Sequence, residues 1–336
     1  SAGDGGACYF NGGGGSYRNV EIIGCYFDNN TAGKGGALYV YMNAIVENTT
    51  FKNNVCSTTG SAIYRKFNGL NIVGCSFNNN NSNGGALIKH FPYHNDTNID
   101  WDSYQVTTID NSVFYNNYCS TYNDGYLLDL VYLEISNSFI MAQNEISSFA
   151  VKAMSIGENN IFLNKVLKYF ELNTSIYLIE NNYWGTKSES EINDLIYDFN
   201  DDPNFNTPFA DYTPFLMGPS PDVAGSPSSI TNLAIKVDSL YQTTLADSIS
   251  AGDTVYVDIS GVDSDTLSKG LASVWVINLT SMDTVTKTLF ETSETSGNYR
   301  GAVYTAESTD NINDVIQGKD GEILKVVSVN DPTVYT

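Results

Sequence analysis

The sequence predicts an all-β protein in which a parallel β-helix is followed by a β-sandwich. Three observations support this prediction. An imperfect repeat of roughly two dozen residues fills the first half of the chain. A stretch rich in Pro and Ser follows, and short alternating strands make up the remainder. A repeat this short cannot bury its own apolar face, so it must stack on copies of itself.

The first half of each repeat has one aromatic residue followed by an asparagine turn. It reads Cys-Tyr-Phe-Asp-Asn-Asn at 25–30, Thr-Thr-Phe-Lys-Asn-Asn at 49–54, Cys-Ser-Phe-Asn-Asn-Asn at 75–80 and Ser-Val-Phe-Tyr-Asn-Asn at 112–117. We expect an aromatic ladder inside the helix and an asparagine ladder at a turn, because asparagine tolerates the left-handed backbone and its amides bond to one another. The aromatic column is Phe27, Phe51, Phe77, Phe114, Ile140, Phe162 and Trp184, and the asparagine column is Asn29, Asn53, Asn79, Asn116 and Asn164.

The second half of each repeat begins with small residues. It reads Gly-Gly-Ala-Leu-Tyr at 35–39, Gly-Ser-Ala-Ile-Tyr at 60–64 and Gly-Gly-Ala-Leu-Ile at 84–88. These glycines predict a second corner, where a β-branched residue would clash. Alternating segments such as 20–22, 44–46 and 70–72 predict strands with one inward and one outward face.

The cysteines follow the repeat. Cys25 and Cys75 share one column and Cys56 and Cys119 share another, in each case with a repeat lacking cysteine between them. Each pair is then two coils apart, about 9.6 Å, whereas a disulfide needs Cα atoms within about 7 Å. We therefore expect thiols in a ladder. Because no Cys-x-x-Cys motif or Cys/His cluster occurs, no zinc site is expected.

Charge restricts the partners. Lys and Arg number 16 against 38 Asp and Glu, so the formal net charge is −22. Nucleic acid and anionic membranes require basic patches, so we expect neither as a partner. No stretch approaches the 18 or so apolar residues of a membrane-spanning helix. Since the sequence has no initial Met, we expect a mature or excised segment of an extracellular or cell-surface protein.

The domain boundaries follow from composition. Residues 1–217 are predicted as the parallel β-helix, 218–229 as a linker and 230–336 as an immunoglobulin-like β-sandwich. A segment from His90 to Tyr104 interrupts the repeat and is predicted to be a solvated loop.

These motifs resemble a known class of surface protein. The Phe-x-Asn-Asn and Gly-Gly-Ala-[Ile/Leu/Val]-Tyr halves are similar to the right-handed parallel β-helix of polymorphic outer membrane proteins and archaeal adhesin-like proteins. Asn-Asn-Tyr-Trp-Gly-Thr at 181–186 and Tyr-Thr-Pro-Phe-Leu at 212–216 resemble the end of such a helix, which implies a short α-helix between them. Glu-Thr-Ser-Gly-Asn-Tyr-Arg-Gly at 294–301 resembles immunoglobulin-like modules of microbial surface proteins. The resemblance implies fold more than function.

Few residues suggest chemistry. Asp96, Asp100 and Asp102, with His90 and His94, are the densest carboxylate and imidazole set of the repeat region, and a polysaccharide lyase or hydrolase would place its site there. Asp198, Asp201 and Asp202 are weak calcium candidates, without the regular 12-residue calcium loop. Asn95, Asn173 and Asn278 are candidate glycosylation sites. Tyr39, Tyr41 and Tyr64 would form a sugar-binding surface if exposed, and part of the core or a self-association contact if buried.

The predicted function is structural. We expect a non-enzymatic, extracellular structural or adhesive protein that assembles head to tail into a fibre, sheath or surface layer, without a required cofactor. The sequence begins within the second half of a repeat and with no capping helix, which favours either truncation or a neighbouring subunit at that end. Two alternatives remain: a polysaccharide-cleaving enzyme and a monomeric carbohydrate-binding adhesin.

Overall fold

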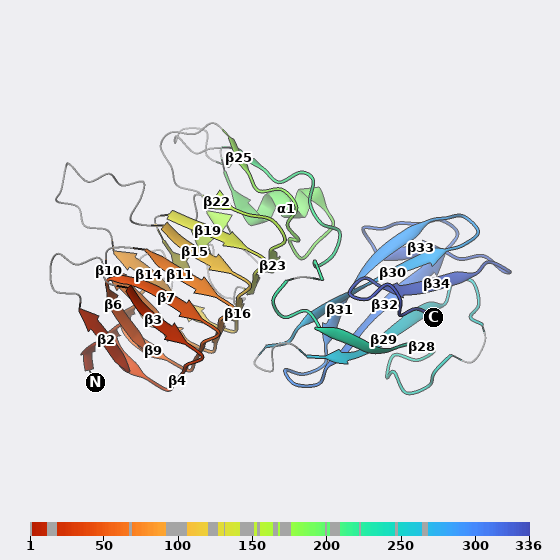
Figure 1. Cartoon of the computed structure of the whole chain (residues 1–336). Helices are drawn as coiled ribbons and strands as arrows, with labels where there is room; N and C mark the ends of the chain where they lie inside the picture. Colours follow the sequence, from red (N-terminus) through yellow and green to blue (C-terminus); the bar gives the residue numbers. More distant parts are fainter. Residues whose placement is uncertain are drawn as a thin grey trace. The chain divides into compact units, whose positions relative to one another are not determined.

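The computed structural model contains two compact units. It describes residues 2–11, 19–66, 69–91, 106–119, 127–130, 132–141, 151–152, 155–163, 167–168, 176–198, 200–201, 209–221, 223–245, 248–263 and 268–336. The first unit comprises Ser1–Trp184 and Ser190–Phe215, and the second comprises Gly185–Glu189 and Leu216–Thr336. Figure 1 shows the strands of the first unit stacked as successive rungs.

Four parallel sheets run along the first unit, here called sheets A to D. Sheet A contains β1 (Ala2–Asp4), β5 (Thr31–Lys34), β9 (Val55–Thr59), β13 (Asn81–Ser82) and β17 (Tyr118–Cys119). Sheet B contains β2 (Cys8–Asn11), β6 (Leu38–Tyr41), β10 (Ile63–Lys66), β14 (Ile88–Phe91), β18 (Leu128–Asp129), β21 (Val151–Lys152), β24 (Leu167–Lys168) and β26 (Ile196–Tyr197). Each sheet takes no more than one strand from any rung, which defines a parallel β-solenoid.

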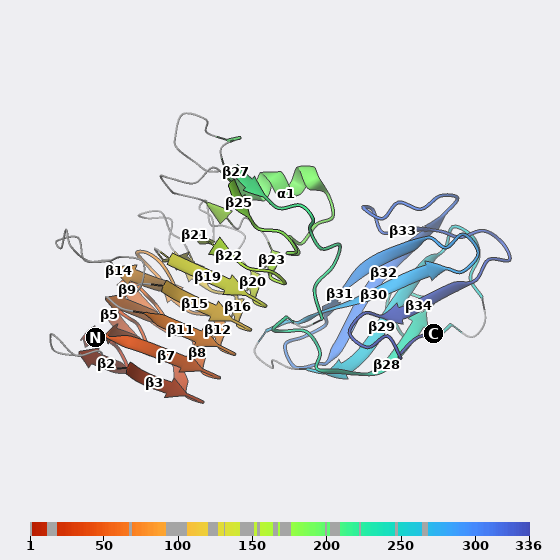
Figure 2. The same cartoon turned by 45° about the horizontal axis from the view of Figure 1, so that its top comes forward.

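The other two sheets complete the rungs. Sheet C contains β3 (Asn19–Ile23), β7 (Asn43–Glu47), β11 (Leu70–Val73), β15 (Val106–Asp110), β19 (Tyr132–Ser136) and β22 (Ser155–Ile156). Sheet D contains β4 (Tyr26–Asp28), β8 (Thr50–Lys52), β12 (Ser76–Asn78), β16 (Val113–Tyr115), β20 (Phe139–Met141) and β23 (Ile161–Leu163). Figure 2 shows strands of sheet C side by side. A helix, α1 (Glu189–Leu195), and a parallel pair, β25 (Ile176–Leu178) and β27 (Phe209–Asp211), follow.

Left-handed residues turn the chain at the corners. The predicted turn residues Asn29, Asn53, Asn79 and Asn116 have φ between 53° and 58°. Some of their amides bond across to the neighbouring rung: Asn116 Nδ2 donates to Asn79 Oδ1 at 2.6 Å, and Asn53 Nδ2 donates to Asp28 Oδ1 at 2.9 Å. At the glycine corner, a Cβ on Gly36 would lie 2.3 Å from the carbonyl oxygen of the next rung. A side chain at Gly36 is therefore excluded, whereas the equivalent position of the next rung holds the small residue Ser61.

The aromatic column forms a stacked ladder in the interior. Adjacent rings from Phe27 to Phe114 have centroids 5.1, 4.9 and 4.7 Å apart. Phe162 and Trp184 form a further stacked pair at 4.8 Å. Parallel in-register strands bring equal positions about 4.8 Å apart, so identical rings repeat at stacking distance.

A second interior ladder consists of buried asparagines one position after the turn residues. The amide nitrogens of Asn30, Asn54 and Asn80 each donate to the Oδ1 of the next rung, at 2.9 Å in every case, ending at Asn117. Each amide nitrogen of Asn54, Asn80 and Asn117 also donates to a Phe carbonyl of the preceding rung. The turn column was predicted from sequence, but this buried column was not.

The second unit is an antiparallel β module with its own core. Its strands are β28 (Ser229–Lys236), β29 (Thr254–Val262), β30 (Leu271–Asn278), β31 (Thr284–Glu291), β32 (Asn298–Ala306), β33 (Val315–Gln317) and β34 (Leu324–Ser328). Val257, Val274 and Tyr299 are fully buried within it. The predicted fold class, a parallel β-solenoid followed by a sandwich-like module, is confirmed. Within the described residues, no helix is both long and apolar enough to span a bilayer.

Candidate functional site

A buried polar cluster lies on the inner side of sheet B. Arg65 of β10 is in register with Val40 of β6 and with His90 of β14, so it occupies a core position. Its Nη1 donates to Thr107 Oγ1 at 2.9 Å, and its Nη2 lies 3.2 Å from His90 Nδ1. Arg65 has no exposed surface, and His90 is 1% exposed. This cluster is the most unusual polar group in the described solenoid interior.

Burial sets the protonation of this cluster. Desolvation lowers the pKa of Arg65 to about 9, so the guanidinium still carries its charge at neutral pH. Desolvation, with the charges of Arg65 and Lys89, lowers the pKa of His90 to about 3. His90 is therefore neutral, and its Nδ1 accepts from Arg65. A neutral buried imidazole beside a fixed cation is poorly suited to exchange protons with a substrate near pH 7.

His90 corrects one sequence expectation. The sequence suggested that His90 begins a solvated insertion, whereas the structure places it in β14. The reason is register: Ile88 pairs with Ile63, and two residues later His90 falls at the same inward position as Arg65. The other members of that predicted set, His94, Asp96, Asp100 and Asp102, lie outside the described residues.

The pH dependence of stability tests this placement. The folded-state pKa of His90 is below the ordinary value of 6.5, so the unfolded chain binds a proton that the folded protein does not. The folded state is therefore not penalised by His90 above pH 6.5, and the free energy of unfolding decreases as the pH falls from 6.5 toward about 3. Between pH 7 and pH 5, we expect the free energy of unfolding to fall by about 2 kcal/mol more for the native protein than for His90→Gln. Urea titrations at both values measure this, and equal losses in the two proteins would refute a buried neutral His90.

The described calcium candidates, Asp198 and Asp201, accept hydrogen bonds from backbone amides. Asp198 is 4% exposed, and its two oxygens accept from the amides of Asn200 at 2.8 Å and Ala210 at 3.0 Å. Asp201 accepts from the amide of Asp198 at 3.0 Å. Asp202 lies outside the described residues, as do Asn95 and Asn173. In the part of the chain with a described structure, no group of three His, Cys, Asp or Glu side chains is arranged to hold a metal.

The remaining candidates also have structural contacts. Asn278 is fully buried, and its Nδ2 donates to Gln317 O and Glu322 Oε2, both at 2.8 Å, which leaves no room for a glycan. Tyr39 and Tyr64 are 6% and 4% exposed and stack on each other at 5.0 Å. Burial, with neighbouring tyrosines and Asp4, raises the pKa of Tyr39 to about 12. Their ring faces are occupied by each other and do not offer a sugar platform.

An open groove lies over the beginnings of the sheet C strands. It has a volume of about 380 Å³, and its polar side chains are Asn19, Asn43, Asn71 and Thr108. Asn43 donates to Asn19 at 3.1 Å, and Thr108 donates to Asn71 at 2.7 Å. Amides and a hydroxyl can bind neutral polar groups such as sugar hydroxyls. No carboxylate or imidazole of the described residues lines the groove, so the described part of its wall offers no group for acid–base catalysis.

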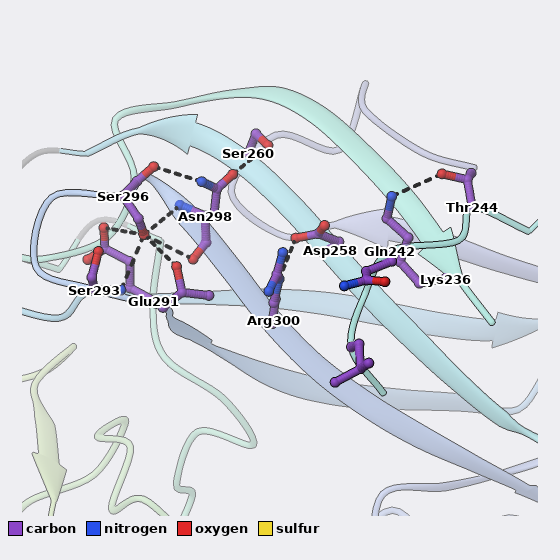
Figure 3. Close-up of polar contacts among 12 residues, drawn as sticks. Lys236, Gln242, Thr244, Asp258, Ser260, Glu291, Ser293, Ser296, Asn298 and Arg300 are labelled. Carbon is purple, nitrogen blue, oxygen red and sulfur yellow. Dashed lines mark hydrogen bonds and ion pairs between the residues drawn. The ribbon is translucent and has the colours of Figure 1, made fainter. Parts of the chain in front are cut away.

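Polar contacts in the second unit fasten its loops (Figure 3). Glu291 is 2% exposed and accepts from the amides of Gly270 at 2.9 Å and Gly297 at 2.8 Å. Arg300 Nε donates to Asp258 Oδ1 at 3.2 Å, and its guanidinium lies 4.8 Å from the centre of the Tyr241 ring. These contacts join strands and turns and form no pocket with an acid and a nucleophile.

The comparisons with known proteins add no family. Neither protein-family models, nor curated proteins, nor solved structures match this chain. Function is therefore inferred from three features of the described residues. These are the long interior ladders, a neutral groove, and buried carboxylates that accept hydrogen bonds from backbone amides.

Proposed function

We propose that this protein is a non-enzymatic, extracellular structural or adhesive component of a cell surface, and that it self-associates. The observation that carries the proposal is the pair of ladders that run through the solenoid. The Phe27–Phe114 stack and the Asn30–Asn117 amide chain cross the same rungs without a break. The buried asparagine side chains bond each rung to the next, and a rod that resists tension requires such bonds.

The mechanism is mechanical. Each rung is joined to the next by parallel backbone pairing in sheets A to D and by the two ladders. A force along the solenoid axis that separates two neighbouring rungs must break all the bonds between them together, because these bonds act in parallel. The charged guanidinium of Arg65 in the core, bonded to Thr107 and His90 of the next rung, adds a polar cross-link.

Self-association has a physical route through the first rung. Strands β1, β2, β3 and β4 lie at the margins of sheets A to D, so each has one edge with no strand partner among the described residues. Asn30 donates from its backbone and side-chain nitrogens to Asn54 Oδ1, so the described amide series begins in this rung. We place a neighbouring copy there, stacked head to tail; the same edges would equally accept another stretch of the same chain.

We also propose the class of surface protein to which the chain belongs. The repeat halves and the sandwich-like module favour an adhesin-like β-helix of the polymorphic outer membrane protein type with an immunoglobulin-like module. Surface glycans are a second class of partner, and the neutral Asn groove of sheet C would be where they bind. Calcium binding at 198–202 stays a prediction.

Sedimentation velocity over a concentration series tests the proposal. We expect the native chain to form larger species with concentration and Cys25→Lys to remain small, because Cys25 is exposed and belongs to the first rung. The lysine side chain can extend into solvent from this exposed position. Met282→Lys, at a 72% exposed site of the second unit, is the control and should behave as native. A monomer at every concentration, or cleavage of any polysaccharide in a panel, would refute the proposal.

A further inference from the structure

A polar pocket lies in the second unit, beside the first residues of β29. It has a volume of about 420 Å³, and most of its lining residues carry polar side chains. Ser248 and Ser250 lie on the segment that leads into β29, Asp253 directly precedes the strand, and Thr254 and Tyr256 belong to it. Each of these five residues is exposed or half-buried. The pocket therefore has the size of a small-molecule site and a polar wall that a ligand can reach.

The polar groups of this pocket are available to a ligand. In the part of the chain that the structure describes, no protein group bonds to the pocket's four hydroxyls, which belong to Ser248, Ser250, Thr254 and Tyr256. Asp253 Oδ2 accepts from the backbone amide of Ser250 at 2.8 Å, whereas its Oδ1 accepts from none of these residues. Four hydroxyls and one carboxylate oxygen are thus free to exchange hydrogen bonds with a bound molecule.

The ring of Tyr256 is held by a chain of contacts. It packs edge-on against the ring of Tyr241, with centroids 5.6 Å apart. The guanidinium of Arg300 lies over the Tyr241 ring and is itself fixed by Asp258 (Figure 3). Tyr241 has a φ of 58°, which is strained for a bulky residue, and the carboxylate of Asp238 holds its turn through three backbone amides. Such maintained strain clusters at binding sites, and here it fixes the Tyr256 ring in advance of any ligand.

This set of groups matches the chemistry of a sugar ring. Sugar hydroxyls donate to a carboxylate such as Asp253 in charge-assisted hydrogen bonds and exchange weaker ones with the Ser and Thr hydroxyls. The ring of Tyr256 offers an apolar surface to the C–H groups of the sugar and a hydroxyl at its tip. An acidic ligand would place its charge against Asp253 on a chain whose net charge is −22, so a neutral sugar is favoured.

We propose that the pocket formed by Ser248, Ser250, Asp253, Thr254 and Tyr256 binds a neutral glycan. This inference rests on the adhesive part of the proposed function and adds a glycan site that differs from the groove of sheet C, which has no described carboxylate. The pocket belongs to the second unit, whereas the proposed self-association uses the first rung of the solenoid. Adhesion and assembly are then carried by different parts of the chain and can be measured separately.

Hydrogen–deuterium exchange of the full chain, read by mass spectrometry, tests the site. The probes are cellobiose, maltose and N,N′-diacetylchitobiose, with digalacturonate as the acidic probe. We expect at least one neutral disaccharide to slow exchange in the peptide 248–256 and digalacturonate to leave it unchanged. Calorimetric titration with the protecting sugar should show Kd raised about tenfold or more by Tyr256→Ala and by Asp253→Asn. Asparagine keeps an acceptor for the Ser250 amide, so the second change removes the charge and leaves the turn intact.

Tyr335→Ala is the matched control and should keep the native Kd. Tyr335 is 60% exposed and bridges to β34, at the opposite margin of the sheet from β28. If Tyr256→Ala does not fold, as judged by circular dichroism, Thr254→Val replaces it, because it removes one hydroxyl at nearly constant volume and should also raise Kd. Protection by none of the neutral sugars, equal protection by digalacturonate, or protection only outside 248–256 would overturn the inference. The proposed self-association is read independently, by sedimentation velocity without sugar.

Discussion

Replacing Asn80 with leucine should lower the free energy of unfolding of the solenoid by on the order of 4 kcal/mol. Asn80 Oδ1 accepts from the backbone and side-chain nitrogens of Asn54 at 3.0 and 2.9 Å. Its Nδ2 donates to Phe51 O at 2.8 Å and Asn117 Oδ1 at 2.9 Å. Leucine has a similar volume but satisfies none of these four bonds, and each buried group left unpaired costs about 1–3 kcal/mol.

Denaturant titration followed by far-UV circular dichroism measures this loss. Asn83→Ala is the matched control, because Asn83 lies in the same rung and is exposed. We expect the control to change the free energy of unfolding by less than about 0.5 kcal/mol. If Asn80→Leu and Asn83→Ala have equal midpoints, the buried amide ladder does not stabilise the rod.

Phe77→Ala should cost the solenoid about 4 kcal/mol. Phe77 is fully buried, and its ring stacks between those of Phe51 at 4.9 Å and Phe114 at 4.7 Å. Alanine leaves a ring-sized cavity in a column whose neighbours are fixed by backbone pairing, so the cavity cannot collapse. Both stacking contacts are lost as well.

Tyr26→Ala is the control for the aromatic ladder. Tyr26 is also an aromatic residue of sheet D, but it is 59% exposed. Thermal unfolding should show a clearly lower midpoint for Phe77→Ala and little change for Tyr26→Ala. A midpoint for Phe77→Ala that matches the control would mean that the ladder is not the main source of stability.

The aromatic ladder could be predicted from the sequence, but the buried amide ladder could not. The four repeats from 25 to 117 each have two adjacent asparagines after the aromatic residue, and the sequence indicated the first of each pair, such as Asn79, as the ladder residue. The left-handed turn at Asn79, with φ of 53°, interrupts the strand alternation. The next residue, Asn80, therefore points inward. Residue type alone cannot distinguish two neighbouring asparagines, and only the backbone conformation does.

Arg65 was missed by the sequence analysis, and His90 was assigned to a solvated loop, for another reason. Polar side chains in a strand are ordinarily assigned to the outer face, because burying a charge is costly. Ile63 faces the core, and strand alternation puts Arg65, two positions further along, on the same face. Counting inward positions onward from Gly-Ser-Ala-Ile-Tyr at 60–64 reaches Arg65, and from Gly-Gly-Ala-Leu-Ile at 84–88 it reaches His90. Their bonds across rungs arise from non-adjacent segments, which no local pattern encodes.

Electron microscopy of the concentrated chain tests the central claim most directly. The account predicts filaments in which one solenoid continues into the next. Dispersed single particles at all concentrations and ionic strengths would contradict it.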